Sequence, residues 1–237
     1  MLTACSDYVK VNLSNKMRRE RDRMMKKKWV VPTITGVTFL VLILLLKFVD
    51  VAAVGPCGTE IGLSHINKAV HDFIGEHMLW YDITDVLGML SLAVAAAFGA
   101  LGVFQFIKRR NLKKVDKKII ALGGLYVVML GCYVLFEKVI INYRPILMPE
   151  SDTPEAAFPS SHTMLVCVIM GSTAMVIGDY VKNDKIKRLL KILCLVMIGI
   201  IVVGRLLAGV HWLTDILGGV LLSATLLGMY ACVTEKL

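Results

Sequence analysis

Two histidines in the C-terminal half of the chain stand in settings that suit phosphoryl chemistry. The first, His211, lies four residues before Asp215, a spacing that places both side chains on one face of a helix. A carboxylate that accepts a hydrogen bond from one imidazole nitrogen fixes the tautomer and leaves the other nitrogen free as a nucleophile. The spacing also fits a histidine that is only paired with a neighbouring acid, so the pair alone leaves both interpretations open.

The second histidine, His162, follows two serines in the stretch Phe-Pro-Ser-Ser-His-Thr-Met, residues 158–164. Pro159 suits the start of a helix, so the backbone N–H groups of Ser160, Ser161 and His162 would be unpaired donors at a helix N-terminus. Such an end is a ready site for an anion. Ser160 also fits an ordinary N-cap, but a cap needs only one serine, and the adjacent histidine favours a functional site.

Three cations are candidates for binding a phosphate. Arg144 and Arg205 can each hold a phosphate through two hydrogen bonds, although single arginines at membrane boundaries also extend toward lipid head groups. Lys138 precedes Arg144. Cations and N–H donors on several sides suit a phosphoryl group, with one histidine attacking and the other protonating the leaving oxygen. The sequence has no Asp-rich cluster for magnesium, so we expect the arginines to stabilise the charge.

The elements that must position these side chains are membrane helices. The 237 residues are 57% hydrophobic with a mean hydropathy of +0.70, and the apolar residues are gathered in blocks. Each block has about the 20 residues that cross a hydrocarbon core, where the backbone must satisfy its own hydrogen bonds. The sequence therefore predicts an all-α integral membrane protein with six transmembrane helices, over residues 29–51, 86–107, 119–140, 161–181, 189–209 and 213–233.

Residues 61–79, between the first two predicted spans, indicate an amphipathic helix in the membrane interface. Apolar residues recur there at helical spacing, with Ile66 and Phe73 among them. Trp80 and Tyr81 follow, and such aromatic residues are typical of the interface. We expect the histidines of this segment to be interfacial polar residues that do not contact substrate.

Membrane topology explains most of the net charge of +9. Lysines and arginines number nine in residues 1–28, seven in 108–118 and five in 182–191, and they are sparse in the alternate connections. Because cytoplasmic loops collect these residues, both termini are predicted to be cytoplasmic. The candidate site residues would then lie on the extracytoplasmic side, and no nucleic-acid partner is needed to explain the charge.

The chain is predicted to form one membrane domain over residues 29–237, preceded by a basic cytoplasmic segment over 1–28. The apolar core of 29–51 is longer than that of a signal peptide, which favours an uncleaved first helix, although Ala52 and Ala53 leave cleavage open. The six cysteines imply neither a disulfide framework nor a zinc site.

The combination of motifs resembles the type-2 phosphatidic acid phosphatase superfamily, whose three blocks read K-x6-R-P, P-S-G-H and S-R-x5-H-x3-D. The matching positions cover residues 138–215 and are Lys138, Arg144-Pro145, Pro159-Ser160-Ser161-His162, Gly204-Arg205, His211 and Asp215. The chain departs from the pattern in three places. Glu137 stands at the usual lysine position, one residue before Lys138; Ser161 replaces a glycine; and Gly204 replaces a serine.

The resemblance implies a six-helix membrane enzyme that works without a metal or another cofactor. It also implies that His211 forms a phosphohistidine, that Asp215 orients His211, and that His162 is the general acid. The residues that would bind the phosphoryl oxygens are Lys138, Arg144, Ser160, the backbone N–H of Ser161, and Arg205.

We therefore expect a metal-independent membrane phosphatase whose lipid substrate keeps its tail in the bilayer and its phosphate at the outer surface. Undecaprenyl diphosphate, phosphatidylglycerophosphate and phosphatidic acid all fit, and undecaprenyl diphosphate is favoured because it is recycled at the outer face. Two alternatives stay open: a non-catalytic binder or transporter of lipid phosphates, and a lipid phosphotransferase that uses the same intermediate. The sequence gives no oligomeric state.

Overall fold

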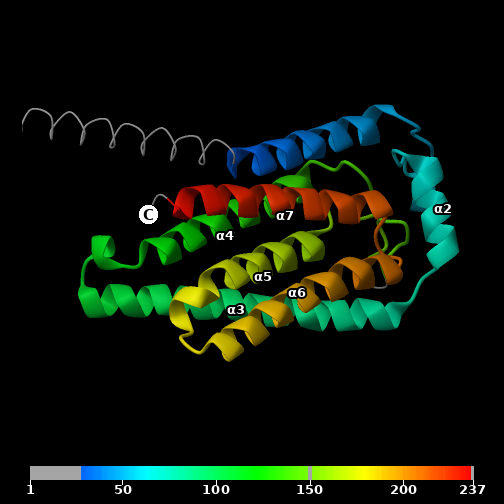
Figure 1. Cartoon of the computed structure of the whole chain (residues 1–237). Coiled ribbons are helices and arrows are strands. Elements are labelled where there is room, and N and C mark those ends of the chain that lie inside the picture. The colour runs from blue at the N-terminus through cyan, green and yellow to red at the C-terminus, as the bar shows by residue number, and fades with distance from the viewer. Residues whose placement is uncertain (1–27, 149–150, 236–237) are drawn as a thin grey trace, which may run out of the picture.

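The computed structural model describes residues 28–148 and 151–235, and all the long elements in these ranges are helices (Figure 1). Six helices are long and apolar enough to cross a membrane: Lys28–Phe48, α3 (Met78–Arg109), α4 (Lys117–Lys138), α5 (Ser161–Tyr180), α6 (Asp184–Leu207) and α7 (Leu213–Thr234). The prediction of an all-α protein with six spans is thus confirmed. Residues 1–27 of the predicted basic segment lie outside the described residues.

A short helix, α2 (Ser64–Ile74), runs across one end of the bundle (Figure 1). It is the amphipathic helix predicted between the first two spans, but it is shorter than residues 61–79. It stops because Gly75 adopts a φ of 73°, a left-handed conformation that ends many helices. Two single turns, η1 (Pro56–Gly58) and η2 (Leu112–Lys114), complete the elements of the described residues.

Helix α3 begins at Met78, well before the start of the predicted span at residue 86. Its first two turns carry polar side chains, among them Tyr81, Thr84 and Asp85. These residues lower the local hydropathy, so a boundary drawn from apolar content falls after them. The difference matters for function, because these two turns contact the candidate site.

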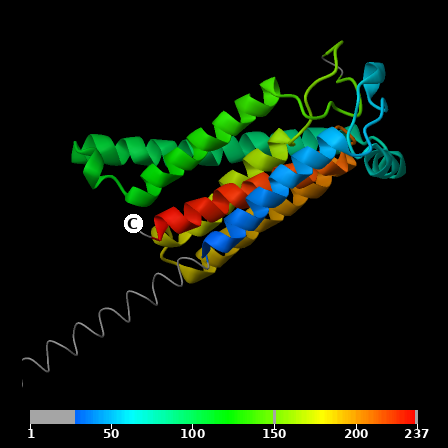
Figure 2. The same ribbon diagram turned by 90° about the horizontal axis from the view of Figure 1, so that it is seen from above.

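Helix α5 is the most buried of the six spans, and it contacts α3, α4, α6 and α7. Figure 2 shows it between a pair formed by α3 and α4 and a group formed by α6, α7 and the first helix. Its apolar side chains Val166, Val168 and Ile169 are fully buried. This part of α5 therefore lies within the core.

The two ends of the bundle carry different parts of the chain. The first helix begins and α7 ends at the same end, where the side chains of Lys28 and Glu235 form an ion pair (Figures 1 and 2). Helix α2 lies at the opposite end, together with the loops that follow α4 and α6. An even number of spans thus returns the chain to the end where it began, and the motif residues gather at the other.

Candidate active site

Four separate elements bring the predicted residues together at the end of the bundle that α2 crosses. Arg144 lies in the loop after α4, His162 in the first turn of α5, Arg205 in the last turn of α6, and His211 in the loop before α7. Arg144, Arg205 and His162 all lie close enough to His211 to act on its charge. Residues separated by up to 67 positions in the sequence therefore share one small region.

The pair of His211 and Asp215 is almost completely buried, and Nδ1 of the ring lies 3.6 Å from Oδ2 of the carboxylate. This distance is too long for a hydrogen bond. Oδ2 instead accepts a hydrogen bond of 2.9 Å from the backbone N–H of Trp212, so the carboxylate also caps the first turn of α7. Because Nδ1 is the nitrogen nearer the carboxylate, Nε2 is the nitrogen available for attack.

The environment of His211 keeps its ring neutral. Burial lowers the pKa of His211 well below its ordinary value of 6.5, and the guanidinium groups of Arg144 and Arg205 lower that pKa further. Neither ring nitrogen has a hydrogen-bond partner among the described residues. A neutral imidazole with a free nitrogen is the nucleophilic form of this side chain.

The guanidinium of Arg205 is fully buried, but only part of it is paired. Nη1 donates to Oγ1 of Thr84 at 3.3 Å, and the guanidinium carbon lies 4.9 Å from the centre of the Tyr81 ring. Nε and Nη2 have no hydrogen-bond partner within residues 28–148 and 151–235, and no carboxylate in these ranges forms an ion pair with Arg205. A buried cation with unused donors is costly, so this arrangement suits an anion that supplies the acceptors.

Gly204 explains how Arg205 reaches helix α3. A Cβ atom at position 204 would lie 2.6 Å from Cγ2 of Thr84 and 3.1 Å from the ring of Trp80. Only a residue without a side chain lets α6 approach α3 this closely. The family pattern has a serine at this position, and in the structure the glycine makes room for the contact that holds Arg205.

His162 has a partner that the sequence did not reveal. Its Nε2 lies 3.0 Å from Oδ1 of Asp85 on α3, at hydrogen-bond distance, while its buried Nδ1 has no partner among the described residues. Asp85 precedes the predicted start of its span. The sequence offered one indication that Asp85 has a role: it is an ionisable residue at a membrane boundary, and such residues are usually functional.

Arg144 is also paired with an acid that was not predicted. Its Nε lies 3.0 Å from Oε2 of Glu155, and its Nη1 is 3.4 Å from the carbonyl oxygen of Val210. Arg144 thus connects the loop after α4 with the loop that carries His211. The side chain is 13% exposed, so the guanidinium is largely shielded from water.

The two serines before His162 differ in their surroundings. Ser160 is the N-cap of α5: its hydroxyl oxygen accepts a hydrogen bond of 3.0 Å from Oγ1 of Thr163. Its backbone N–H donates to the carbonyl oxygen of Asp215 at 3.0 Å, so the expectation that this N–H is an unpaired donor is wrong. The neighbouring Ser161, by contrast, lines the pocket beside His211.

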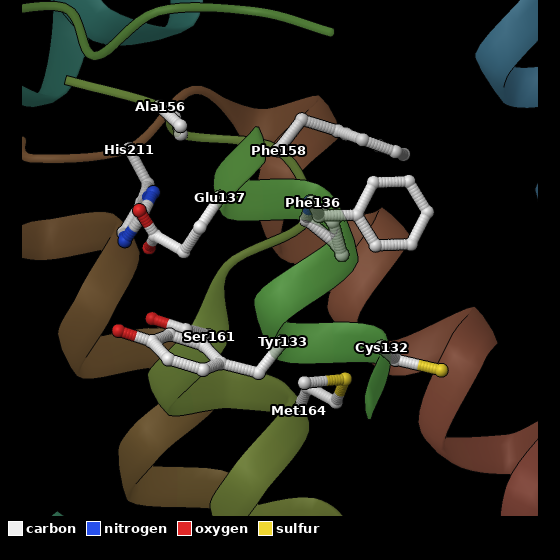
Figure 3. Close-up of a pocket in the computed structure, with 11 residues that line it drawn as sticks. Cys132, Tyr133, Phe136, Glu137, Ala156, Phe158, Ser161, Met164 and His211 are labelled. Carbon is white, nitrogen blue, oxygen red and sulfur yellow. The ribbon is translucent and has the colours of Figure 1, made fainter. Parts of the chain in front are cut away.

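Glu137 and Lys138 occupy different places at the end of α4. Glu137 lines the narrow pocket beside His211, and Figure 3 shows its carboxylate pointing toward the ring. Lys138 is exposed and does not line that pocket. The structure therefore brings the acid at the usual lysine position to the site, but not the lysine that follows it.

An apolar groove of about 380 Å³ opens on the other side of His162. Its walls come from α3, α4 and α5, and its lining residues include Gly88, Leu92, Met129, Tyr133 and Leu165. Asp85 and His162 form its polar end. The groove thus joins an apolar channel to the polar side chains of the site.

Helix α2 supports the loop that carries His211. The amide nitrogen of Asn67 donates to Oγ1 of Thr214 at 2.9 Å, and the backbone N–H of Thr214 is 3.3 Å from Oδ1 of Asn67. Nε2 of His71 lies 3.0 Å from the carbonyl oxygen of Gly209. His71 was expected to be an interfacial residue, and its contact with this loop was missed because it depends on how α2 docks.

Comparisons with known proteins agree with this fold. The family model of the PAP2 superfamily matches residues 118–237, just over half of the chain. No curated protein matches. Among solved structures, the chain is similar to the first transmembrane PAP2 type phosphatidylglycerolphosphate phosphatase from Bacillus subtilis, with a TM-score of 0.60 and 18% identity over 87% of this chain and 97% of that one. At this identity the similarity shows a shared fold.

Proposed function

This chain belongs to the PAP2 superfamily, and on that basis we propose that it is a membrane phosphatase that hydrolyses a lipid phosphate or diphosphate through a phosphohistidine. The observation that carries the proposal is Arg205, a fully buried cation beside a neutral His211, with two donor nitrogens that have no partner among the described residues. Buried donors that face a nucleophile suit the developing charge of a phosphoryl group in transfer.

In the first step, Nε2 of His211 attacks phosphorus while the bond from phosphorus to the leaving oxygen breaks. Its electron pair stays on the leaving oxygen, which takes a proton from His162. Asp215 stabilises the positive charge on the His211 ring once a nitrogen is bonded to phosphorus. Arg205, Arg144 and the backbone N–H of Ser161 bind the three non-bridging oxygens.

In the second step, a water molecule attacks the phosphorus of the phosphohistidine. His162, neutral after the first step, takes a proton from this water, and the bond from His211 to phosphorus breaks. Inorganic phosphate leaves and both histidines return to their starting states. The charges on the arginines stabilise both transition states, so the proposed mechanism is independent of metal ions.

Two predicted phosphate ligands have weaker support. Lys138 is exposed and would have to turn at the end of α4 to reach the phosphate. The hydroxyl of Ser160 is buried and already engaged by Thr163. We still propose that both residues bind the phosphate, but that they contribute less than Arg144 and Arg205.

The apolar groove beside His162 supports a lipid as the substrate. A tail that lies between α3 and α4 would place its phosphate at the polar end of the groove, next to His162 and Asp85. The similar Bacillus subtilis protein is a phosphatidylglycerolphosphate phosphatase, which makes that lipid a candidate here. Undecaprenyl diphosphate and phosphatidic acid also join an apolar tail to a phosphate. Undecaprenyl diphosphate stays the favoured substrate because it is recycled at the outer face, where we propose that the site lies.

For the orientation in the membrane, we propose that both termini are cytoplasmic and that the site is extracytoplasmic. The loops at the end opposite the site, residues 108–118 and 182–191, hold most of the loop lysines and arginines. In a chain whose exposed Cys57 is replaced by serine, labelling from outside intact cells should reach a cysteine introduced at exposed Glu60 and should not reach one introduced at exposed Lys113.

The deciding experiment measures phosphate release by the purified protein from each candidate lipid, with a metal chelator present. We expect release from at least one lipid, and its loss in His211→Gln, while lipid binding by that variant persists. Binding without release from any lipid by the wild-type protein would indicate a binder or transporter. Transfer of the phosphoryl group to another lipid, seen by mass spectrometry of the products, would indicate a phosphotransferase.

A further inference from the structure

We propose that Asp85 on α3 is a positioning residue that holds His162 in the orientation and protonation state of a general acid. The site then contains two Asp–His pairs, one for the nucleophile and one for the acid. This inference rests on the proposed function, because Asp85 has this role only if His162 donates a proton to the leaving group.

The hydrogen bond between Asp85 and His162 decides which ring nitrogen can serve the substrate. Nε2 lies 3.0 Å from Oδ1 of Asp85, so its N–H donates to the carboxylate. Nδ1 is buried and has no partner among the residues that the structure describes. Nδ1 is therefore the nitrogen that carries the transferable proton, and Asp85 stabilises the imidazolium before transfer.

The proton balance follows from this assignment. As the bond to the leaving oxygen breaks, the Nδ1 proton moves to that oxygen, and His162 is left neutral with its Nε2–H still donating to Asp85. The attacking water later returns a proton to Nδ1. Asp85 stays ionised throughout and forms no bond to substrate.

Helix α3 also fixes the plane of the His162 ring. Gly88 lies one turn after Asp85, and a Cβ atom there would be 3.1 Å from Cδ2 of His162. The ring therefore packs against bare backbone on the edge next to its hydrogen bond with Asp85. Gly88 leaves just enough room for this fit.

The same turn of α3 holds the main phosphate ligand. Thr84, adjacent to Asp85, accepts the hydrogen bond from Nη1 of Arg205. Arg205 from α6 and Arg144 from the loop after α4 both face His162, and Asp85 is the one described carboxylate bonded to its ring. The negative charge of Asp85 thus opposes the repulsion between these two cations and a proton on His162.

The test compares Asp85→Asn with Asp82→Asn, a control on the same helix whose exposed side chain contacts neither histidine. Each full-length variant is assayed on a phosphate monoester with an alkyl leaving group and on p-nitrophenyl phosphate, whose leaving group needs little help from an acid. We expect Asp85→Asn to lower kcat/KM for the alkyl ester by about 10- to 100-fold, a part of the 10²- to 10⁴-fold contribution of a general acid. The loss on p-nitrophenyl phosphate should be several-fold smaller, and Asp82→Asn should match the wild type.

Two further measurements separate positioning from general damage. Adding Asp85→Asn to His162→Ala should cause no additional loss, because the two residues act as one unit. Asp85→Asn should shift the alkaline limb of the pH–rate profile to lower pH. Asp85→Glu should recover part of the lost rate and move this limb back toward its position in the wild type. Inorganic phosphate should still inhibit Asp85→Asn, at a concentration no higher than for the wild type, which shows that the phosphate site is still folded.

The outcomes distinguish this inference from the proposed function. Equal losses on both substrates, or losses that add in the double variant, would overturn the role of Asp85 while leaving a working phosphatase. If the wild-type protein releases no phosphate from any substrate, the proposed function fails, and the inference fails with it.

Discussion

The backbone N–H of Ser160 donates to the carbonyl oxygen of Asp215 at 3.0 Å, and this bond joins the start of α5 to the start of α7. His162 follows Ser160 by two residues and His211 precedes Asp215 by four. The bond therefore fixes the two histidines relative to each other through backbone atoms. Gly219 allows this close approach, because a Cβ atom at that position would lie 3.0 Å from the carbonyl oxygen of Ser160.

Replacing Arg205 should separate stability from activity. The variant Arg205→Met removes a buried charge, two of whose donor nitrogens have no partner in the described part of the chain, and keeps an apolar stem of similar length. Because such replacements are often neutral or stabilising, we expect an unchanged or higher unfolding temperature in detergent, together with a loss of at least about 10²-fold in phosphate release. Thermal unfolding and phosphate release of the same samples test this, and a variant that is active and unstable would contradict it.

The two residues at the end of α4 should affect phosphate binding differently. Glu137 lines the pocket of His211, so Glu137→Gln removes a negative charge near the bound anion. We expect inorganic phosphate to inhibit this variant at a several-fold lower concentration than the wild type. Lys138→Ala should change inhibition less than Arg144→Ala does, and exposed Glu60→Gln serves as the charge-matched control.

The buried state of His211 predicts that acid destabilises the fold. Its pKa is lowered in the folded protein, so below the ordinary value of 6.5 the unfolded chain binds a proton that the folded chain does not. Stability should therefore fall as the pH drops below 6.5, by at most about 2 kcal/mol at pH 5 from this residue. Unfolding temperatures in phosphate-free buffer at pH 7.5 and pH 5 should differ more for the wild type than for His211→Gln.

The contact between α2 and the His211 loop should matter for turnover. Asn67 is fully buried and bonds to Gly62 and to both the backbone and the side chain of Thr214. Asn67→Ala removes these bonds, at about 1 kcal/mol each, and loosens the contact of α2 with the start of α7, next to the loop that carries His211. We expect a lower kcat and a lower unfolding temperature, whereas Lys68→Ala on the exposed face of α2 should change neither.

The features that were predicted correctly depend only on short stretches of the sequence. The six spans follow from apolar blocks of sufficient length, and α2 follows from helical periodicity. The proximity of Arg144, His162, Arg205 and His211 could be predicted because motifs mark these residues and the alternation of spans puts the ends of their helices on one side. These signals need no knowledge of how the helices pack.

The residues that were missed act through contacts between helices. Asp85, Thr84 and Tyr81 lie in polar turns that a hydropathy boundary excludes, and their partners sit on α5 and α6. Glu155 lies in a polar loop with no motif, yet it pairs with Arg144. The hydrogen bond from the Ser160 N–H to the carbonyl oxygen of Asp215 likewise depends on how α5 packs against α7, which no local sequence pattern predicts.

The groove between α3 and α4 has exposed apolar side chains, Met89 and Leu130, along its lining, so it opens sideways toward the acyl chains of the bilayer. A lipid that enters this way never passes through water. Under the proposed function, the protein and its lipid substrate then meet by diffusion in the plane of the membrane. The turnover rate should follow the mole fraction of substrate in the membrane rather than its concentration in solution.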